Sequence, residues 1–218
     1  VRGARASVTA AVPYAGFESS PLLPVAATPP STIMDARGTA ATNCPGWTFM
    51  ATSGNNQAGY QRNGSYFSNT AAAQTTSGVQ TAFIRISGWM QAPLLFPTNG
   101  TYAVTYRYCS RYYGSWFTNQ ILRTRVDGVL KDEFVANKRA FSERTVSLGY
   151  LSAGTHTLRF EGAGGFAGET DPCTLIDDVR VTGISAVGGV AAVSNEETAL
   201  WILSGAQMDL DYSGTLSV

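Results

Sequence analysis

Short runs in which apolar and polar side chains alternate recur along this chain, separated by glycine, asparagine or proline. In the clearest run, residues 101–109, every second position is apolar or aromatic: Tyr102, Val104, Tyr106 and Tyr108. A period of two places such side chains on one face of a β-strand, and helical periodicity is nearly absent. Similar runs occupy residues 78–86, 89–96, 121–130, 155–160 and 174–181. The pattern predicts an all-β fold, an antiparallel sandwich or barrel.

Charge excludes two classes of partner. The 218 residues carry 15 Lys and Arg against 15 Asp and Glu, so there is no net positive field to attract nucleic acid or anionic lipid. No apolar run reaches the roughly 18 residues that span a bilayer. Only 14% of residues are charged, a balance common in extracellular β-proteins. We therefore expect a secreted protein, and the absence of an initial Met favours a processed or excised piece.

The sequence divides into three parts. Residues 1–12 have no strong pattern and are predicted to be an N-terminal arm. Residues 13–184 contain the alternating runs and are predicted to be the sandwich. A small-residue linker then leads into short strand-like pieces, so residues 185–218 are predicted to be a linker and a C-terminal β appendage, solenoid-like or used between subunits.

Cys44, Cys109 and Cys173 are widely spaced and form no CxxC pair. With His156 as the one imidazole, a zinc site is not expected. One disulfide with a spare thiol suits an oxidising compartment, and three buried free thiols are the alternative. The sequence leaves the pairing open.

Asp177 interrupts an apolar face. In the run 174–181 it shares one side of the predicted strand with Leu175, Val179 and Val181. Burying a bare carboxylate costs several kcal/mol. Asp177 is therefore expected to be hydrogen-bonded, neutralised or bound to a cation.

A series of short motifs follows in order along the chain. They are Gly16-Phe17-Glu18, Gly46-Trp47-Thr48-Phe49, Ala58-Gly59-Tyr60, Gly64-Ser65-Tyr66-Phe67, Gly78-Val79-Gln80-Thr81-Ala82-Phe83, Asn99-Gly100-Thr101-Tyr102, Val126-Asp127-Gly128, Ala153-Gly154-Thr155-His156-Thr157-Leu158 and Ile176-Asp177-Asp178-Val179. In this order they resemble the galactose-binding-like β-sandwich domain of bacterial surface and plant cell-wall proteins, and more loosely the carbohydrate-binding modules. The resemblance covers about residues 13 to 184.

This resemblance implies a non-enzymatic jelly-roll β-sandwich, exported and associated with polysaccharide or cell wall. In related carbohydrate-binding modules an early and a late carboxylate share a structural calcium ion. Carried over by motif, the ligands are Glu18 with Asp177 or Asp178, and Ca2+ favours such oxygen ligands. Satisfaction of the Asp by backbone N–H groups or Arg is the alternative.

The tail resembles a different class of protein. Residues 200–218, through Ser204-Gly205-Ala206-Gln207-Met208-Asp209-Leu210, are similar to repeats of autotransporter-like β-solenoid surface proteins. One solenoid rung cannot bury its apolar face alone, so the resemblance implies truncation or completion by another chain.

Aromatic and amide side chains are concentrated between residues 107 and 120. Sugars stack their C–H faces on aromatic rings and receive hydrogen bonds from amides and guanidinium groups, which makes this segment the predicted ligand-binding site. The alternative is that these aromatic residues cap the core or form a protein contact. Trp47, outside this segment, is expected in the core. The predicted ligand-binding residues are Arg111, Tyr112, Tyr113, Trp116, Asn119 and Gln120.

Catalysis has little support in the sequence. His156 shares its predicted strand face with Leu158 and Phe160, which favours a packed or rim histidine over a Ser/His/Asp site. No nucleophile elbow appears, and the spacing of the carboxylates selects no glycosidase pair. The chain is predicted not to be an enzyme.

The predicted function is therefore extracellular carbohydrate binding or cell-surface adhesion, with cell-wall or cell-surface polysaccharide as partner. The alternative is a structural subunit of a surface filament or layer, self-associating by strand exchange through its N- and C-terminal segments, because open strand edges accept strands from neighbours.

Overall fold

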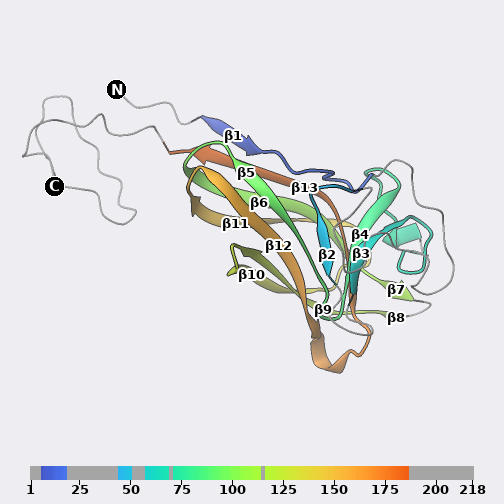
Figure 1. The fold of residues 1–218 in the computed structure, drawn as a ribbon. Helices are drawn as coiled ribbons and strands as arrows, with labels where there is room; N and C mark the ends of the chain where they lie inside the picture. Colours follow the sequence, from blue (N-terminus) through green and yellow to red (C-terminus); the bar gives the residue numbers. More distant parts are fainter. Residues whose placement is uncertain (1–5, 19–43, 51–56, 69–70, 114–115, 187–218) are drawn as a thin grey trace, which may run out of the picture.

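Two antiparallel β-sheets pack face to face in the computed structural model, which describes residues 6–18, 44–50, 57–68, 71–113 and 116–186 (Figure 1). Sheet A has the order β11 (Ser142–Leu151), β6 (Gly100–Ser110), β13 (Cys173–Ser185), β4 (Gln80–Arg85) and β3 (Gln57–Arg62), and β1 (Ser7–Ala10) also pairs with β13. Sheet B has the order β10 (Val129–Ala136), β9 (Gln120–Val126), β12 (Gly154–Gly165), β5 (Trp89–Phe96) and β2 (Thr48–Met50). Two short 3-10 helices, η1 (Ala71–Ala73) and η2 (Phe166–Gly168), lie in connections. The predicted all-β sandwich is confirmed.

The core between the sheets is filled from alternate strand positions, as the sequence pattern predicts. Tyr102, Val104 and Tyr106 of β6 are buried on the inner side of sheet A. From the opposite sheet, Phe160 of β12 meets Tyr106 edge to face, with ring centroids 4.8 Å apart. Aromatic and branched side chains fill the half-buried surface of a pleated sheet well, which explains why these runs form strands.

Trp47 closes one side of this core, as expected. It is 1% exposed, and its indole nitrogen donates a hydrogen bond of 2.7 Å to the carbonyl oxygen of Pro13. Phe17 packs against it with a centroid distance of 5.4 Å. The turn at residues 13–17 is thereby fixed to the sandwich, and Glu18 follows it directly.

A hairpin turn at Asp127-Gly128 divides the run 121–130 into β9 and β10, where Val126 pairs with Val129. Both turn residues have positive φ, +50° and +80°. A two-residue hairpin turn whose twist matches that of its strands requires this conformation, and Asp-Gly adopts it readily.

β13 is bordered by two different strands along one edge. β4 pairs with its first residues, Cys173 to Ile176, and β1 pairs with Val181 to Ile184. Thus Ser7–Ala10, within the segment predicted to be an arm, is a strand of sheet A, and β13 continues to Ser185. The linker and tail from residue 187, including the solenoid-like motif, lie outside the described residues.

Candidate functional site

The aromatic segment selected from the sequence contains a two-stranded hairpin at the end of the sandwich away from the start of β1 (Figure 1). β7 (Tyr112–Tyr113) pairs with β8 (Trp116–Phe117), with Tyr113 opposite Trp116 and Tyr112 opposite Phe117. We call residues 112–117 the aromatic hairpin. Its backbone strands are described, whereas its side chains and residues 114 and 115 lie outside the described part. The register brings the predicted residues Tyr112, Tyr113 and Trp116 into one ribbon.

The base of the aromatic hairpin is tied to β13. The backbone nitrogen of Arg111 donates to the carbonyl oxygen of Cys173 at 2.8 Å, and that of Thr118 donates to the carbonyl of Arg111 at 3.1 Å. The backbone nitrogen of Cys173 in turn donates to the Thr118 hydroxyl at 3.1 Å. Both ends of the hairpin are therefore held by one strand of sheet A.

Arg111 is not presented to solvent, although the sequence placed it among the ligand-binding residues. It is 3% exposed and lies over the rings of Tyr66 and Phe67, 4.6 and 4.9 Å from their centroids. Its Nη1 atom lies 2.6 Å from Oδ2 of Asp171, whose Oδ1 lies 2.5 Å from Nε of Arg85. The described position of Arg111 supports the hairpin base from within and does not offer its guanidinium to a ligand.

Gln120 is also buried, at 0% exposure. Its Nε2 atom donates to the carbonyl oxygen of Ile86 at 2.8 Å, which links β9 to the end of β4. Asn119 is half-buried, and its carbonyl oxygen accepts a 2.8 Å hydrogen bond from the backbone nitrogen of Phe166. Of the six predicted ligand-binding residues, Arg111 and Gln120 thus stabilise the base of the hairpin.

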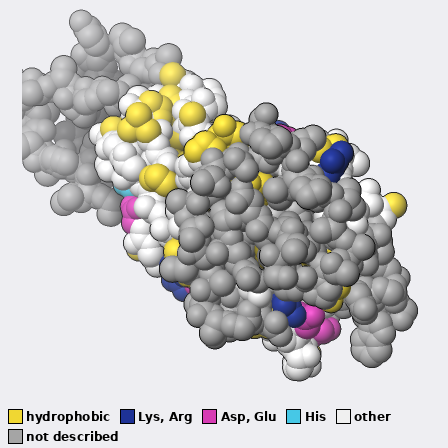
Figure 2. Space-filling model, turned by 45° about the vertical axis from the view of Figure 1, so that its right-hand side comes forward, with side chains coloured by type: hydrophobic (Ala, Val, Ile, Leu, Met, Phe, Trp, Pro, Cys, Tyr) yellow, Lys and Arg dark blue, Asp and Glu magenta, His cyan; other side chains and the backbone are white. Residues whose placement is uncertain are grey.

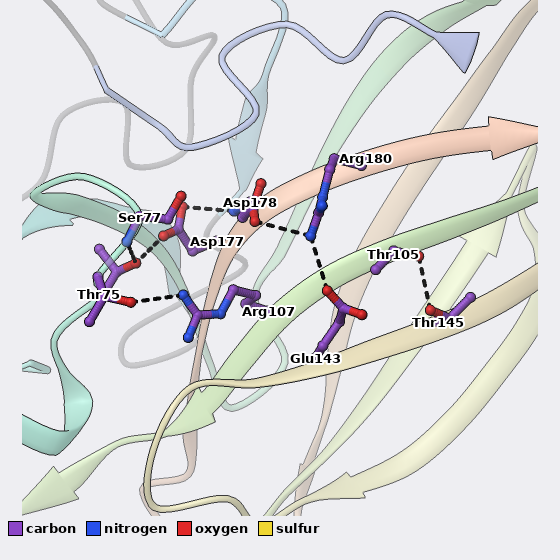
Figure 3. Close-up of polar contacts among 10 residues, drawn as sticks. Thr75, Ser77, Thr105, Arg107, Glu143, Thr145, Asp177, Asp178 and Arg180 are labelled. Atoms are coloured by element: carbon purple, nitrogen blue, oxygen red, sulfur yellow. Dashed lines mark hydrogen bonds and ion pairs between the residues drawn. The ribbon is translucent and has the colours of Figure 1, made fainter. Parts of the chain in front are cut away.

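Two of the three carboxylates selected as metal ligands, Asp177 and Asp178, are neighbours on β13 (Figure 3), and the charge of the third, Glu18, acts on Asp177. Asp177 is 0% exposed, accepts a hydrogen bond from the Thr75 hydroxyl on Oδ2, and accepts one of 2.8 Å on Oδ1 from the Asp178 backbone nitrogen. Burial raises the pKa of Asp177 to about 7, against the effect of these two hydrogen bonds. The sequence left three ways to satisfy Asp177, a hydrogen bond, neutralisation or a cation, and the structure shows the hydrogen bonds.

Glu18 lies in the same region, held by the start of β4. Its Oε1 atom accepts hydrogen bonds of 2.7 and 2.9 Å from the backbone nitrogens of Val79 and Gln80 at the start of β4. Gly78 has a φ of +102°, and a Cβ placed on it would lie 2.0 Å from that Oε1 atom. A glycine at position 78 is therefore what lets the carboxylate approach the strand.

The protein contacts of these carboxylates leave few of their oxygens available to a calcium ion. Ca2+ takes six to eight oxygen ligands that converge on one point, whereas both oxygens of Asp177 and one of Glu18 already accept protein hydrogen bonds. Oδ2 of Asp178 lies 3.1 Å from Nη2 of Arg180. Across the described ranges no group of three or more His, Cys, Asp or Glu side chains is placed to hold a metal ion. Calcium stays a prediction drawn from the resemblance.

His156 lies at the rim of sheet B, where Figure 2 shows the one histidine beside an acidic side chain. Its Nδ1 atom lies 2.6 Å from Oδ2 of Asp127, and its Nε2 atom lies 3.0 Å from the carbonyl oxygen of Ser152. Because a carbonyl oxygen can only accept, Nε2 carries a proton, and the hydrogen bond to Asp127 raises the pKa of His156. Although the Ser152 hydroxyl is 3.3 Å from Nε2, an imidazole that donates from both nitrogens is not poised as a general base.

The expected disulfide is absent, since Cys44, Cys109 and Cys173 are all free and buried. Burial raises the pKa of Cys173 to about 12 and raises that of Cys109 as well. The thiolate is the reactive form of cysteine, so these thiols behave as small core side chains.

The outer face of sheet A carries a polar network that the sequence did not single out (Figure 3). Arg180 of β13 bridges Glu143 of β11, at 3.0 Å, and Asp178, at 3.1 Å. On the same face the hydroxyls of Thr105 and Thr145 lie 2.9 Å apart. These residues occupy outward positions of neighbouring strands. Predicting that they meet requires the register of the strands, which a single sequence does not give.

A shallow pocket of about 220 Å³ lies between β1 and β13, lined mainly by apolar groups from residues such as Ala10, Val12 and Val179. Pockets for small organic ligands have volumes of roughly 300–1,000 Å³. This one is smaller and open, so it is not a candidate for a small-molecule site.

Neither a protein-family model nor a curated protein sequence matches the chain. Among solved structures it is similar to a family 35 carbohydrate-binding module from Clostridium thermocellum, with 18% identity and a TM-score of 0.41 over 64% of this chain and 92% of that one. It is also similar to the CBM22-1 xylan-binding domain of a Paenibacillus barcinonensis protein, with 13% identity and a TM-score of 0.44 over 75% of this chain and 99% of that one. At these scores no function is transferred to this chain. Within the described residues, no helix is long and apolar enough to cross a membrane.

Proposed function

We propose that this chain is a non-catalytic, exported polysaccharide-binding domain of a cell surface or cell wall, and that the aromatic hairpin makes contact with sugar. The observation that carries the proposal is the pairing of Tyr113 with Trp116 in a ribbon whose base is hydrogen-bonded to β13. A sugar loses little binding energy to ordering when the aromatic residues that receive it stand on a fixed backbone.

Two further features support this proposal. The buried contacts of Arg111 with Asp171, Tyr66 and Phe67 hold the hairpin base independently of any ligand. The imidazole of His156, a candidate base, is occupied by Asp127 and Ser152. A hairpin base fixed by buried contacts and a histidine held in structural contacts favour binding over bond-making.

The test is a screen of the full chain against an array of cell-wall and cell-surface polysaccharides. Trp116→Ala and Tyr113→Ala are each expected to weaken binding by more than roughly tenfold, because stacked aromatic residues dominate such contacts. Tyr150→Ala is the matched control, since Tyr150 is 62% exposed on β11, away from the hairpin. An array without signal, or hairpin variants that bind as tightly as wild type, would remove this function.

A second candidate is a subunit that exchanges its N-terminal strand with a neighbour, because β1 occupies an edge of β13, the last described strand, that the β1 of a second copy fits in the same way. Thr9 of β1 lies directly opposite Thr182 of β13, far away in sequence. A Thr9→Cys, Thr182→Cys double variant, oxidised at high protein concentration, therefore reports which chain supplies β1. Covalent dimers on a denaturing gel support exchange, and monomers that carry an internal crosslink contradict it.

A further inference from the structure

Outward positions on four adjacent strands of sheet B bring together arginine, glutamate and tryptophan side chains. Arg159 of β12 pairs with Gln91 of β5 on one side and with Arg125 of β9 on the other. Two residues further along, Glu161 stands between Trp89 of β5 and Arg123 of β9, and β10 adds Glu133 opposite Arg123. We call the surface formed by Trp89, Arg123, Arg125, Glu133, Arg159 and Glu161 the arginine face.

Positive charge is in excess on the arginine face. Glu133 pairs with Arg123 at 2.5 Å, whereas Glu161 serves Arg125 at 2.7 Å, Arg159 at 3.0 Å and, at 4.0 Å, Arg123 as well. Three guanidinium groups thus share two carboxylates among the described residues. The surface is also accessible, because the side chains of Arg123, Arg125 and Arg159 are 35%, 25% and 30% exposed.

Arg159 is the least completely neutralised of the three. Its guanidinium lies 4.1 Å from the ring centroid of Trp89, and its Nε atom, although near Glu161, has no aligned hydrogen-bond partner in the described structure. Burial lowers the pKa of Arg159 and the charge of Arg125 lowers it further, against the opposing effect of Glu161. An arriving anion relieves this repulsion, and a planar guanidinium binds a carboxylate with paired hydrogen bonds.

The arginine face continues along β5 as a line of groups suited to a sugar chain. Trp89, Gln91, Pro93 and Leu95 all point outward at alternate positions, and Leu95 is 67% exposed. Alternate residues of a strand are spaced by roughly 6.5 Å, so these four side chains extend over about 20 Å. The rings and apolar groups of this line suit the C–H faces of a sugar chain, and the amide of Gln91 suits the hydroxyl groups of the sugar.

We propose that the arginine face binds a polysaccharide that carries anionic groups, carboxylate or sulfate, with Arg159 stacked on Trp89 as the anion-recognising residue. This inference rests on the proposed polysaccharide-binding function and adds to it a substrate class and a second contact surface. Charge complementarity selects the occupant, since a neutral glycan leaves the excess guanidinium charge without a counter-ion.

The test compares three probes by affinity electrophoresis and calorimetry with the full chain: polygalacturonate, its carboxyl-reduced neutral form, and a sulfated galactan. The wild-type protein is expected to bind an anionic probe more tightly than the reduced one. That affinity is expected to fall as salt rises from about 50 mM to about 300 mM, because screening shortens the range of exposed charges. The preference between carboxylate and sulfate identifies which anionic group the surface receives.

Arg159→Gln is expected to weaken binding of the anionic probe by roughly ten- to a hundredfold, which is the loss of one charge-assisted contact. Arg180→Gln is the matched control, because Arg180 is also paired with carboxylates but lies on the outer face of sheet A. Salt dependence measured on the wild-type protein keeps the test valid if the Arg159 variant fails to fold.

Equal binding of polygalacturonate and its reduced form, or equal losses from Arg159→Gln and Arg180→Gln, overturns the inference. If neutral polysaccharides bind through Trp116 while Arg159→Gln has no effect, the arginine face is excluded and the proposed function stands. If no polysaccharide of any charge binds, both fail together.

Discussion

Asp171 forms an ion pair with Arg111 in which Oδ2 of the carboxylate lies 2.6 Å from Nη1 of a side chain that is only 3% exposed. The other oxygen of Asp171 lies 2.5 Å from Nε of Arg85, which is 9% exposed. One carboxylate thus compensates two largely buried cations at the base of the aromatic hairpin. The anchoring of the candidate site therefore depends on a residue that belongs to neither strand of the hairpin.

Asp171→Asn is expected to lower the free energy of unfolding by about 1–3 kcal/mol, because it leaves two buried guanidinium groups without their shared carboxylate. Partial exposure of Asp171 keeps the cost below that of a fully buried pair. Urea unfolding followed by tryptophan fluorescence measures the change. Glu143→Gln is the control, since its ion pair with Arg180 is exposed on both sides and is worth less than about 1 kcal/mol. Equal effects of the two substitutions contradict this view of Asp171.

Gly78→Ala separates steric crowding from backbone strain. Gly78 and Gly128 both have positive φ, but an added Cβ meets the Glu18 carboxylate only at position 78, and it meets nothing within 4 Å at position 128. Gly128→Ala is expected to cost about 1–2 kcal/mol from backbone conformation alone. Gly78→Ala is expected to lower the free energy of unfolding by about 3 kcal/mol or more, because the Glu18 carboxylate must also give up its two hydrogen bonds from backbone N–H groups. Chemical denaturation measures the free energy of unfolding of both variants. Losses of similar size would show that Glu18 is not held by this contact.

The contact between His156 and Asp127 predicts a pH dependence with a defined sign. The pKa of His156 is raised by its hydrogen bond to Asp127, so the folded protein holds this proton more tightly than the unfolded chain does. The stabilisation is fully present below the unfolded pKa of about 6.5 and is lost as pH rises through the folded value. Because the Asp127 side chain is 49% exposed, screening limits the effect to less than about 1 kcal/mol.

The measurement is the difference in unfolding free energy between the wild type and His156→Gln at several pH values. We expect this difference to be largest near pH 5.5 and to shrink as the pH rises above about 6.5 and through the raised pKa of the folded protein. A difference that grows with pH would mean that the imidazole is neutral when folded.

The strands were predictable because their signal is local. The alternation over residues 101–109 corresponds to β6, and Asp127-Gly128 forms the turn between β9 and β10. β1 was missed because Ser7–Ala10 is short and contains no strong apolar face. Its pairing with Val181 to Ile184 comes from the far end of the sandwich, and a single sequence does not show such a partner.

The candidate site was predictable in composition but not in the position of each side chain. Arg111 and Gln120 carry groups that suit a sugar, yet their partners Asp171 and Ile86 lie 60 and 34 positions away in sequence. Burial of these two residues follows from that tertiary pairing. The approach of Glu18 to Asp177 was implied by the resemblance. The donors to their oxygens are Thr75 and Val79 in the loop before β4, Gln80 at its start, and the backbone of Asp178 on β13.

The last prediction concerns calcium at Glu18, Asp177 and Asp178. Because these carboxylates already accept hydrogen bonds from Thr75, Val79, Gln80 and the Asp178 backbone, we expect millimolar calcium and EDTA to leave the melting temperature unchanged. Saturation at a hundred times Kd adds about 2.7 kcal/mol, which raises the melting temperature of a domain of this size by roughly 5–11 °C. Magnesium at the same ionic strength controls for screening. A rise of that size with calcium alone, abolished by Asp177→Asn, would mean that binding turns these oxygens from their protein donors toward one shared ion.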